Sequence, residues 1–340
     1  MNASTKAVVT GAGGFIGHHL VNYLKEKGHW VRGVDIKEPE FEPTRADEFL
    51  LLDLRERQNC LLATAGIEEV YALAADMGGM GFISANHARI LHNNALINIH
   101  TLEAARKTGV QRYLYTSSAC IYPEYRQLET AVRPLREEDA YPAQPQDAYG
   151  WEKLMAEQLC HYYRTEYGLE TRTVRFHNIF GPLGTWEGGR EKAPAAMCRK
   201  VAVAKVSGNP EVEIWGDGKQ TRSFCYIDDC VEGIYRLMRS DYHEPLNLGQ
   251  DRLISIDELV DIVTDIAGVQ VIKKYVAGPQ GVRGRNSDNT RLRQVLDWEP
   301  QIPLEEGLAR TYAWIEGQVA TYQAAVVPDS ANRAAVKATL

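Results

Sequence analysis

A tyrosine and a lysine stand four residues apart at Tyr149 and Lys153, where the pattern predicts an amphipathic helix from Leu154 to Tyr167 that ends at Gly168. Residues i and i+4 share one face of a helix, so the phenol and the ammonium can point into the same cleft. A nearby positive charge lowers the pKa of a tyrosine, which can then take a proton from an alcohol at neutral pH. Because this spacing also arises by chance, the pair alone is weak evidence.

Two further polar side chains, Ser118 and Cys120, follow a predicted strand from Arg112 to Ser117. Alternate residues on an extended chain face the same side, so both can face the cleft. A lone cysteine is also commonly a small buried hydrophobe, and the residues alone leave both interpretations of Cys120 open.

A glycine turn lies between a predicted strand, Lys6 to Thr10, and a predicted helix, His18 to Lys27. In this context the glycines allow a tight turn and the close approach of a pyrophosphate, and the helix N-terminus offers amides to the phosphates. The alternative is a plain tight turn. The predicted cofactor contacts of the turn are Gly11, Gly14, Phe15, Ile16 and Gly17.

Two acidic residues end the next strands. Asp35 follows the predicted strand Trp30 to Val34, where a carboxylate can bind the adenosine ribose hydroxyls and repel a 2′-phosphate. We therefore expect NAD rather than NADP as the cofactor. Asp53 follows the strand Glu48 to Leu52, and it is either a helix N-cap or a contact of the adenine amino group.

Composition excludes several classes of protein. The net charge of −7 argues against a nucleic-acid surface, and no apolar run reaches the ~18 residues of a spanning helix. The N-terminus shows no signal-peptide pattern, and the six cysteines are scattered without a C-x-x-C pair. We expect a cytoplasmic protein that contacts neither nucleic acid nor membrane and holds no metal.

The order of strands and helices predicts an α/β fold: a Rossmann-like doubly wound parallel sheet with a smaller C-terminal α/β substrate lobe. Residues 1–178, with about 225–252, form the predicted NAD-binding domain, and 179–224 with 253–320 form the lobe. Residues 77–82 are expected to be a loop, and 212–215 and 220–226 to be strands of one small sheet. The last helix is expected from Leu304 to Gln318, with a frayed tail over 321–340.

The glycine turn, Ser118 and the Tyr149/Lys153 pair resemble the extended short-chain dehydrogenase/reductases that act on nucleotide sugars. Within that family, the resemblance is strongest to the enzymes that invert C3 and C5 of GDP-mannose, over roughly residues 6–320. It is carried by the segments 75–83, 117–124, 188–194, 215–224 and 281–289. The tail does not resemble the C-terminal extension of those enzymes.

The resemblance implies a role for each matching residue. Tyr149 is the base on the sugar O4, Lys153 orients the nicotinamide ribose, and Ser118 binds O4. Cys120 and Lys192 are the acid/base pair at the neighbouring carbons. A homodimer is implied through the helices Asn86–Lys107 and Trp151–Tyr167. The implied contacts of the nucleotide sugar are Gly78, Ser118, Ala119, Cys120, Asn178, Glu191, Lys192, Lys200, Gln220, Arg222 and Arg285.

The chemistry fits such a set of residues. Oxidising C4 to a ketone makes the C–H groups at C3 and C5 acidic, and each inversion needs a proton removed from one face and delivered to the other. The expected product is GDP-L-galactose, with GDP-L-gulose when only C5 inverts. The alternatives are a nucleotide-sugar 4-epimerase or 4,6-dehydratase, and a non-catalytic NAD-sensing protein.

Overall fold

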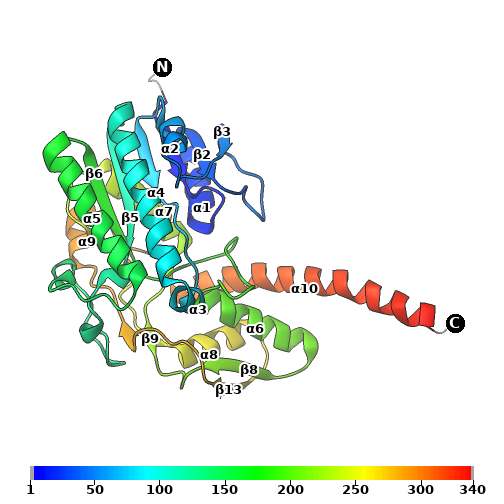
Figure 1. The fold of residues 1–340 in the computed structure, drawn as a ribbon. Helices are drawn as coiled ribbons and strands as arrows, with labels where there is room; N and C mark the ends of the chain where they lie inside the picture. Colours follow the sequence, from blue (N-terminus) through cyan, green and yellow to red (C-terminus); the bar gives the residue numbers. More distant parts are fainter. Residues whose placement is uncertain (1–3, 338–340) are drawn as a thin grey trace.

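The computed structural model describes residues 4–337, and its centre is a seven-stranded parallel sheet (Figure 1). The strand order is β11-β6-β5-β4-β1-β2-β3, which is that of a doubly wound fold and confirms the predicted class. The strands are β1 (Lys6–Thr10), β2 (Trp30–Asp35), β3 (Glu48–Leu51), β4 (Glu69–Ala72), β5 (Arg112–Ser118), β6 (Glu170–Phe176) and β11 (Leu246–Leu248).

Helices cover both faces of this sheet, and the apolar run of β1 shows why. Ala7 and Val9 belong to one hydrophobic cluster and Val8 to the other, and all three are fully buried. A strand buried on both faces reads as a continuous apolar run. One face carries α1 (Phe15–Glu26) and α7 (Ile227–Arg239); the other carries α2 (Arg57–Thr64), α4 (His87–Thr108) and α5 (Ala148–Tyr167).

The C-terminal lobe holds three small sheets and the helices α6 (Ala193–Ser207) and α8 (Ile256–Ala267). The expectation of one small sheet around the turn at 216–218 is wrong. β8 (Glu211–Trp215) pairs with β13 (Ile272–Val276), whereas β9 (Thr221–Arg222) lies between β12 (Ile254–Ser255) and β14 (Gly284–Arg285). Two glycines with positive φ, Gly216 and Gly218, redirect the chain between the two sheets. β7 (Ile179–Phe180) pairs with β10 (Cys225–Tyr226).

Several bounds differ from the predictions. The segment expected to be a loop at 77–82 runs into α3 (Met80–Ala85). α10 (Leu304–Lys337) extends beyond the predicted Gln318 and leaves the body of the molecule in Figure 1. Residues 338–340 of the predicted tail lie outside the described residues, and the predicted domain boundaries stay a prediction. The remaining short helices are η1 (Ala119–Ile121), η2 (Glu124–Arg126), η3 (Glu137–Ala140) and α9 (Thr290–Leu296).

None of the helices within residues 4–337 combines the length and apolar character needed to cross a bilayer. The loops that follow β1, β4, β5 and β6 all leave the sheet at the carboxyl ends of parallel strands. In an open α/β sheet this edge is where ligands bind, and the residues singled out by their chemistry meet there.

Candidate active site

The glycine turn is sterically suited to a bound pyrophosphate. Gly11 has a φ of +74°, and a Cβ on Gly17 would lie 2.1 Å from the Gly11 carbonyl oxygen, so α1 packs closely on β1 only with glycine at both positions. Gly14 caps α1 without a side-chain hydrogen bond, which leaves the first amides of the helix, including those of Phe15 and Ile16, facing the turn. The residues present therefore fit a dinucleotide phosphate group.

Asp35 lies beside this turn and accepts three backbone hydrogen bonds, from Gly13 at 3.0 Å, Ile36 at 2.6 Å and Lys37 at 3.3 Å. Burial raises the pKa of the Asp35 carboxyl, and these three donors act against that rise. A carboxylate has about four acceptor positions, so capacity remains for a ribose hydroxyl. Asp35 thus fits the predicted contact with the adenosine ribose.

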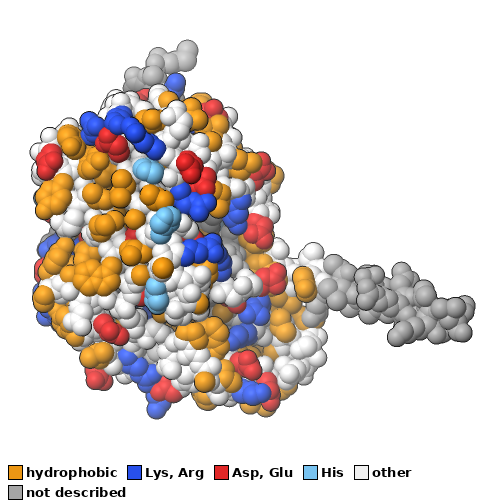
Figure 2. Space-filling model, in the orientation of Figure 1, with side chains coloured by type: hydrophobic (Ala, Val, Ile, Leu, Met, Phe, Trp, Pro, Cys, Tyr) orange, Lys and Arg blue, Asp and Glu red, His pale blue; other side chains and the backbone are white. Residues whose placement is uncertain are grey.

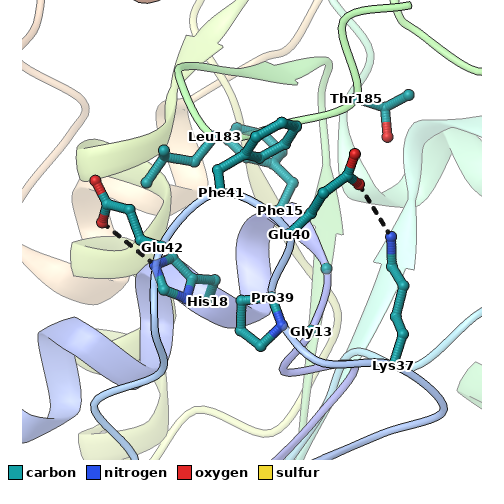
Figure 3. Close-up of a pocket in the computed structure, with 11 residues that line it drawn as sticks. Gly13, Phe15, His18, Lys37, Pro39, Glu40, Phe41, Glu42, Leu183 and Thr185 are labelled. Carbon is teal, nitrogen blue, oxygen red and sulfur yellow. Dashed lines mark ion pairs between the residues drawn. The ribbon is translucent and has the colours of Figure 1, made fainter.

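A pocket opens between the turn and the loop that follows β2 (Figure 3). Two ion pairs line it, Lys37 with Glu40 and His18 with Glu42, each at 3.6 Å. The sequence analysis missed both glutamates, because no local pattern folds the loop back over the turn. Leu183 and Thr185 line the opposite side of the pocket.

Asp53 does not cap a helix, because α2 begins at Arg57 and its N-cap is Glu56. Instead the Asp53 carboxylate binds the backbone amide of Arg55 at 3.0 Å and pairs with the Arg55 guanidinium. That hydrogen bond from the arginine is the main reason that the pKa of Asp53 is lowered. The predicted adenine contact of Asp53 stays a prediction.

Tyr149 and Lys153 lie in the first two turns of α5, both buried, as their spacing predicted. The Lys153 ammonium donates to the carbonyl oxygen of Thr116 at 3.0 Å and lies 5.6 Å from the centre of the Tyr149 ring. Burial raises the pKa of the Tyr149 phenol well above 10 and lowers that of Lys153. The expectation that Lys153 lowers the pKa of Tyr149 in this state is therefore wrong: the ammonium faces the ring and a carbonyl, and desolvation dominates.

Ser118, Ala119 and Cys120 form what we call the strand flank of the site, at the end of β5 and in η1. The Cys120 amide donates to Ser118 Oγ at 3.1 Å, and a hydrogen bond from Ser118 acts against the raised pKa of Tyr149. Arg285 donates from Nη1 to Cys120 Sγ at 3.3 Å. Cys120 is half-buried, whereas the other five cysteines are buried. The interpretation of Cys120 as an inert core residue is therefore disfavoured.

Residues 188–192 form the loop flank, opposite the strand flank. Lys192 is the N-cap of α6 and is open to solvent over much of its surface, but protein atoms crowd its ammonium and lower its pKa. The thiols that act electrostatically on it are those of Cys120 and Cys230. Glu191 is occupied by Arg199 at 2.9 Å and by the amide of Gly189 at 2.7 Å.

The remaining predicted contacts fall into two groups. Arg222 lies near Arg285 and Cys120, and its burial, followed by the charge of Arg285, lowers its pKa to about 9. Gly78 is buried beside Phe82, next to the segment that contacts the loop flank. These residues are brought together around the strand and loop flanks.

The second group lies around β8 and at the end of β6. Lys200 donates to the carbonyl oxygen of Glu213 at 2.6 Å, and Gln220 donates to that of Trp215 at 2.9 Å. Gln220 Oε1 is buried and has no hydrogen-bond partner within the described residues. Asn178 has a φ of +47° and donates to the carbonyl oxygen of Ser223 at 2.8 Å.

Two supporting residues were missed by sequence reasoning. Gln127 is 1% exposed and accepts from Arg285 Nε at 2.6 Å, which fixes the guanidinium that contacts Cys120. A Cβ on Gly150 would lie 2.2 Å from the Cys120 carbonyl oxygen. A glycine in the first turn of a helix, beside Tyr149, was the available signal for this close approach; nothing in the sequence marks Gln127.

Among residues 4–337, no three His, Cys, Asp or Glu side chains converge as metal ligands would.

Known proteins are similar to this chain in sequence and in fold. The model of the NAD dependent epimerase/dehydratase family matches residues 7–249. The chain is 51% identical to the GDP-mannose 3,5-epimerase of Arabidopsis thaliana, over 92% of this chain and 83% of the relative. It is 52% identical to GDP-mannose 3,5-epimerase 1 of Oryza sativa subsp. japonica, over 92% and 82%. Its fold is similar to that of UDP-glucose 4-epimerase from Thermotoga maritima, with a TM-score of 0.84 and 27% identity over 93% and 100% of the two chains.

Proposed function

Because this chain belongs to the NAD dependent epimerase/dehydratase family, we propose that it inverts C3 and C5 of GDP-mannose through transient oxidation at C4. The product is GDP-L-galactose, with GDP-L-gulose formed when only C5 inverts. The observation that carries the proposal is the Cys120 thiol, which is half-buried and accepts a hydrogen bond from Arg285 Nη1 at 3.3 Å.

Oxidation at C4 is needed because a C–H beside ordinary alcohols is too weakly acidic to lose its proton. Bound NAD supplies reversible hydride acceptance at C4, so the cycle ends without net oxidation. The glycine turn and Asp35 would hold the dinucleotide, and Lys153 would hold its nicotinamide ribose. In all other steps, residues of this chain transfer protons or contact the substrate.

Tyr149 takes the proton of the sugar O4. Burial of the phenol raises the free energy of the phenolate, and the hydrogen bond from Ser118 lowers it. Lys153 adds positive charge on the same helix face. Once C4 is oxidised, Ser118 and the protonated Tyr149 donate to the oxygen at C4 and stabilise the enolate that forms when C3 or C5 loses its proton.

Cys120 and Lys192 exchange protons with C3 and C5. Inversion requires a proton to leave one face of the carbon and return on the other, and two groups on opposite sides of a ring do this directly. A 4-epimerase needs no such pair, and a 4,6-dehydratase of the kind considered above would have carboxylates after Ser118, where this chain has Ala119 and Cys120. The proposed reaction therefore accounts for side chains that these alternatives leave without a role.

The nucleotide would extend along the C-terminal lobe. Arginines bind phosphates through paired N–H groups, and Arg222 and Arg285 lie close enough for one to lower the pKa of the other. An anion bound between the two guanidinium groups reduces the repulsion between their like charges. The buried, unpaired Gln220 Oε1 is an acceptor available to an N–H group of the base. Glu191, Asn178, Gly78 and Lys200 complete the proposed set of contacts.

The test is to incubate the purified protein with GDP-mannose in D2O and to follow the sugar by NMR. We expect deuterium at C3 and C5 together with new galactose-type signals. Cys120→Ala should retain NAD binding and lose exchange at one of the two carbons, whereas Cys60→Ala, at a buried position on α2, should exchange at both. Deuterium at neither carbon in the wild type would overturn the proposal and favour the 4-epimerase alternative.

We also propose a homodimer formed through α4 and α5. Figure 2 shows hydrophobic side chains gathered on the side of the molecule where these helices lie. They include Leu91, Ile99, Trp151, Met155 and Tyr162, which are 39–53% exposed. Such a patch on a soluble domain commonly marks an interface. A monomer mass in sedimentation would overturn this proposal. The six free cysteines are typical of a reducing compartment and support a cytoplasmic location.

A further inference from the structure

The loop flank is held from outside by Arg190, a residue to which no role has been given above. Its guanidinium carbon lies 3.8 Å from the centre of the Phe82 ring, at the distance of a stacked cation–π contact. Its Nη1 lies 3.7 Å from the carboxylate of Asp76. The Arg190 carbonyl oxygen also accepts a hydrogen bond from the Gly79 amide at 3.0 Å. Arg190 thus joins the loop flank to the 76–82 segment, which follows β4 on the other side of the cleft.

The partner of Arg190 is itself fixed. Asp76 pairs with Arg89 at 2.8 Å and accepts from Asn93 at 2.9 Å, while its amide donates to Asn94 at 2.7 Å. All three partners lie on α4, one of the helices that cover the main sheet. Asp76 is therefore a rigid anchor on the NAD-binding half of the molecule.

On that side the loop flank also contacts Gly79, where a Cβ would lie 2.6 Å from the Glu191 carbonyl oxygen. Gly188 and Gly189 have φ values of +82° and +83°, and no atoms lie within 4 Å of where a Cβ would be placed on either. Glycine adopts these φ values without steric cost, so the two residues do not themselves fix the position of the loop flank. The Glu191–Arg199 pair fixes the loop flank to α6 only, within its own lobe.

We propose that Arg190 is a positioning residue, which closes the loop flank against Phe82 and Asp76 and thereby holds the Lys192 ammonium opposite Cys120. The expected effect of Arg190 on proton transfer rests on the proposed function, whereas its effect on the position of the loop flank does not. The titratable groups that act on the Lys192 ammonium are the thiols of Cys120, from η1, and Cys230, from α7. Opening the loop flank would move the ammonium away from both and return it to water.

The first experiment needs no substrate. Lysines of the NAD-bound enzyme are reductively methylated with ¹³C-formaldehyde, and the Lys192 signal, assigned by its loss in Lys192→Arg, is titrated by NMR. Burial lowers the pKa of the Lys192 ammonium, so Arg190→Met, which removes the contacts of the loop flank with Phe82 and Asp76, should raise that pKa. Arg190→Lys, which keeps the charge without the planar stack, should lie between the two. Arg45→Met, which removes an exposed arginine paired with Glu26, is the matched control.

The second experiment measures function. We expect Arg190→Met to lower deuterium exchange at the carbon served by Lys192 by on the order of 10- to 100-fold, because a displacement of about 1 Å costs that much. The transient reduction of bound NAD at 340 nm, which reports oxidation at C4, should not change. An unaltered Lys192 titration together with unaltered exchange would overturn the role of Arg190. If the wild type exchanges no deuterium, the proposed function fails, and the titration alone then decides whether Arg190 holds the loop flank.

Discussion

The two flanks of the cleft carry one proton-transfer group each and are built in opposite ways. Cys120 on the strand flank lies in η1, just after β5, which is buried from Tyr113 to Ser118, and its neighbours Arg285 and Gln127 are buried and hydrogen-bonded. Lys192 on the loop flank follows two glycines with positive φ and is held through side chains that are partly exposed. The core therefore positions Cys120, whereas Lys192 is positioned by contacts between partly exposed side chains. This difference suits a site that must admit a nucleotide sugar and then exclude water.

The largest expected effect comes from a residue that both flanks depend on. Tyr149→Phe removes the base for O4, so it should lower exchange at both C3 and C5 by about 10²- to 10⁴-fold. Substitution of Cys120 or Lys192 should affect transfer on one face only. The measurement is site-resolved deuterium incorporation by NMR, with NAD binding as the control. Loss at only one carbon in Tyr149→Phe would show that the flanks act without a shared oxidation.

The next effect tests the rigidity of the strand flank. A Cβ at Gly150 would overlap the Cys120 carbonyl oxygen, so Gly150→Ala should displace Cys120 and lower turnover about 100-fold. Stability should fall by about 1–3 kcal/mol, which urea unfolding can measure. Gly317→Ala in α10 is the control, because no atom lies within 4 Å of its Cβ position. Wild-type turnover in Gly150→Ala would contradict the close approach.

The core next to the strand flank carries a pH-dependent weakness at His177, which lies against Tyr122. Burial lowers the pKa of His177 from 6.5 to about 3, so the folded chain binds fewer protons than the unfolded chain between these values. The stability that neutral His177 contributes is present above pH 6.5 and is lost as pH falls toward 3. By pH 5 the loss amounts to about 2 kcal/mol of unfolding free energy.

The measurement for His177 is urea unfolding at pH 7 and pH 5. The His177→Asn variant should be less stable at pH 7 and should lose less stability between the two pH values than the wild type. His87→Asn, at an exposed position on α4, should follow the wild type at both. An identical pH dependence in the two variants would exclude His177 as the source.

The smallest expected effect concerns the support of the loop flank by α6. Glu191→Gln weakens the pair with Arg199, a contact that is worth about 1 kcal/mol or less. Amide hydrogen exchange over 187–192 should rise about fivefold, while the midpoint of urea unfolding stays the same. The same rise in α1 or α5 would mean that the substitution loosens the whole chain and that the flanks do not differ in mobility.

The sequence predicted correctly the elements that carry the local motifs. The glycine turn, Asp35 at the end of β2 and the Tyr149/Lys153 spacing each depend on a few consecutive residues, and all three lie where they were expected. The electrostatics were less predictable. The direction of the Tyr149 pKa was wrong, because desolvation depends on every atom packed around the phenol and not on one nearby lysine.

By itself, then, the sequence determined the α/β class, the dinucleotide turn and the identity of the groups that can transfer protons, because periodicity and short spacings encode them. Only the tertiary structure decided which distant groups meet. Cys120 and Arg285 stand 165 residues apart along the chain, and Asp76 and Arg190 lie on segments that follow β4 and β7. Such contacts depend on the paths of loops and on how two lobes pack, and no local pattern of residues records either.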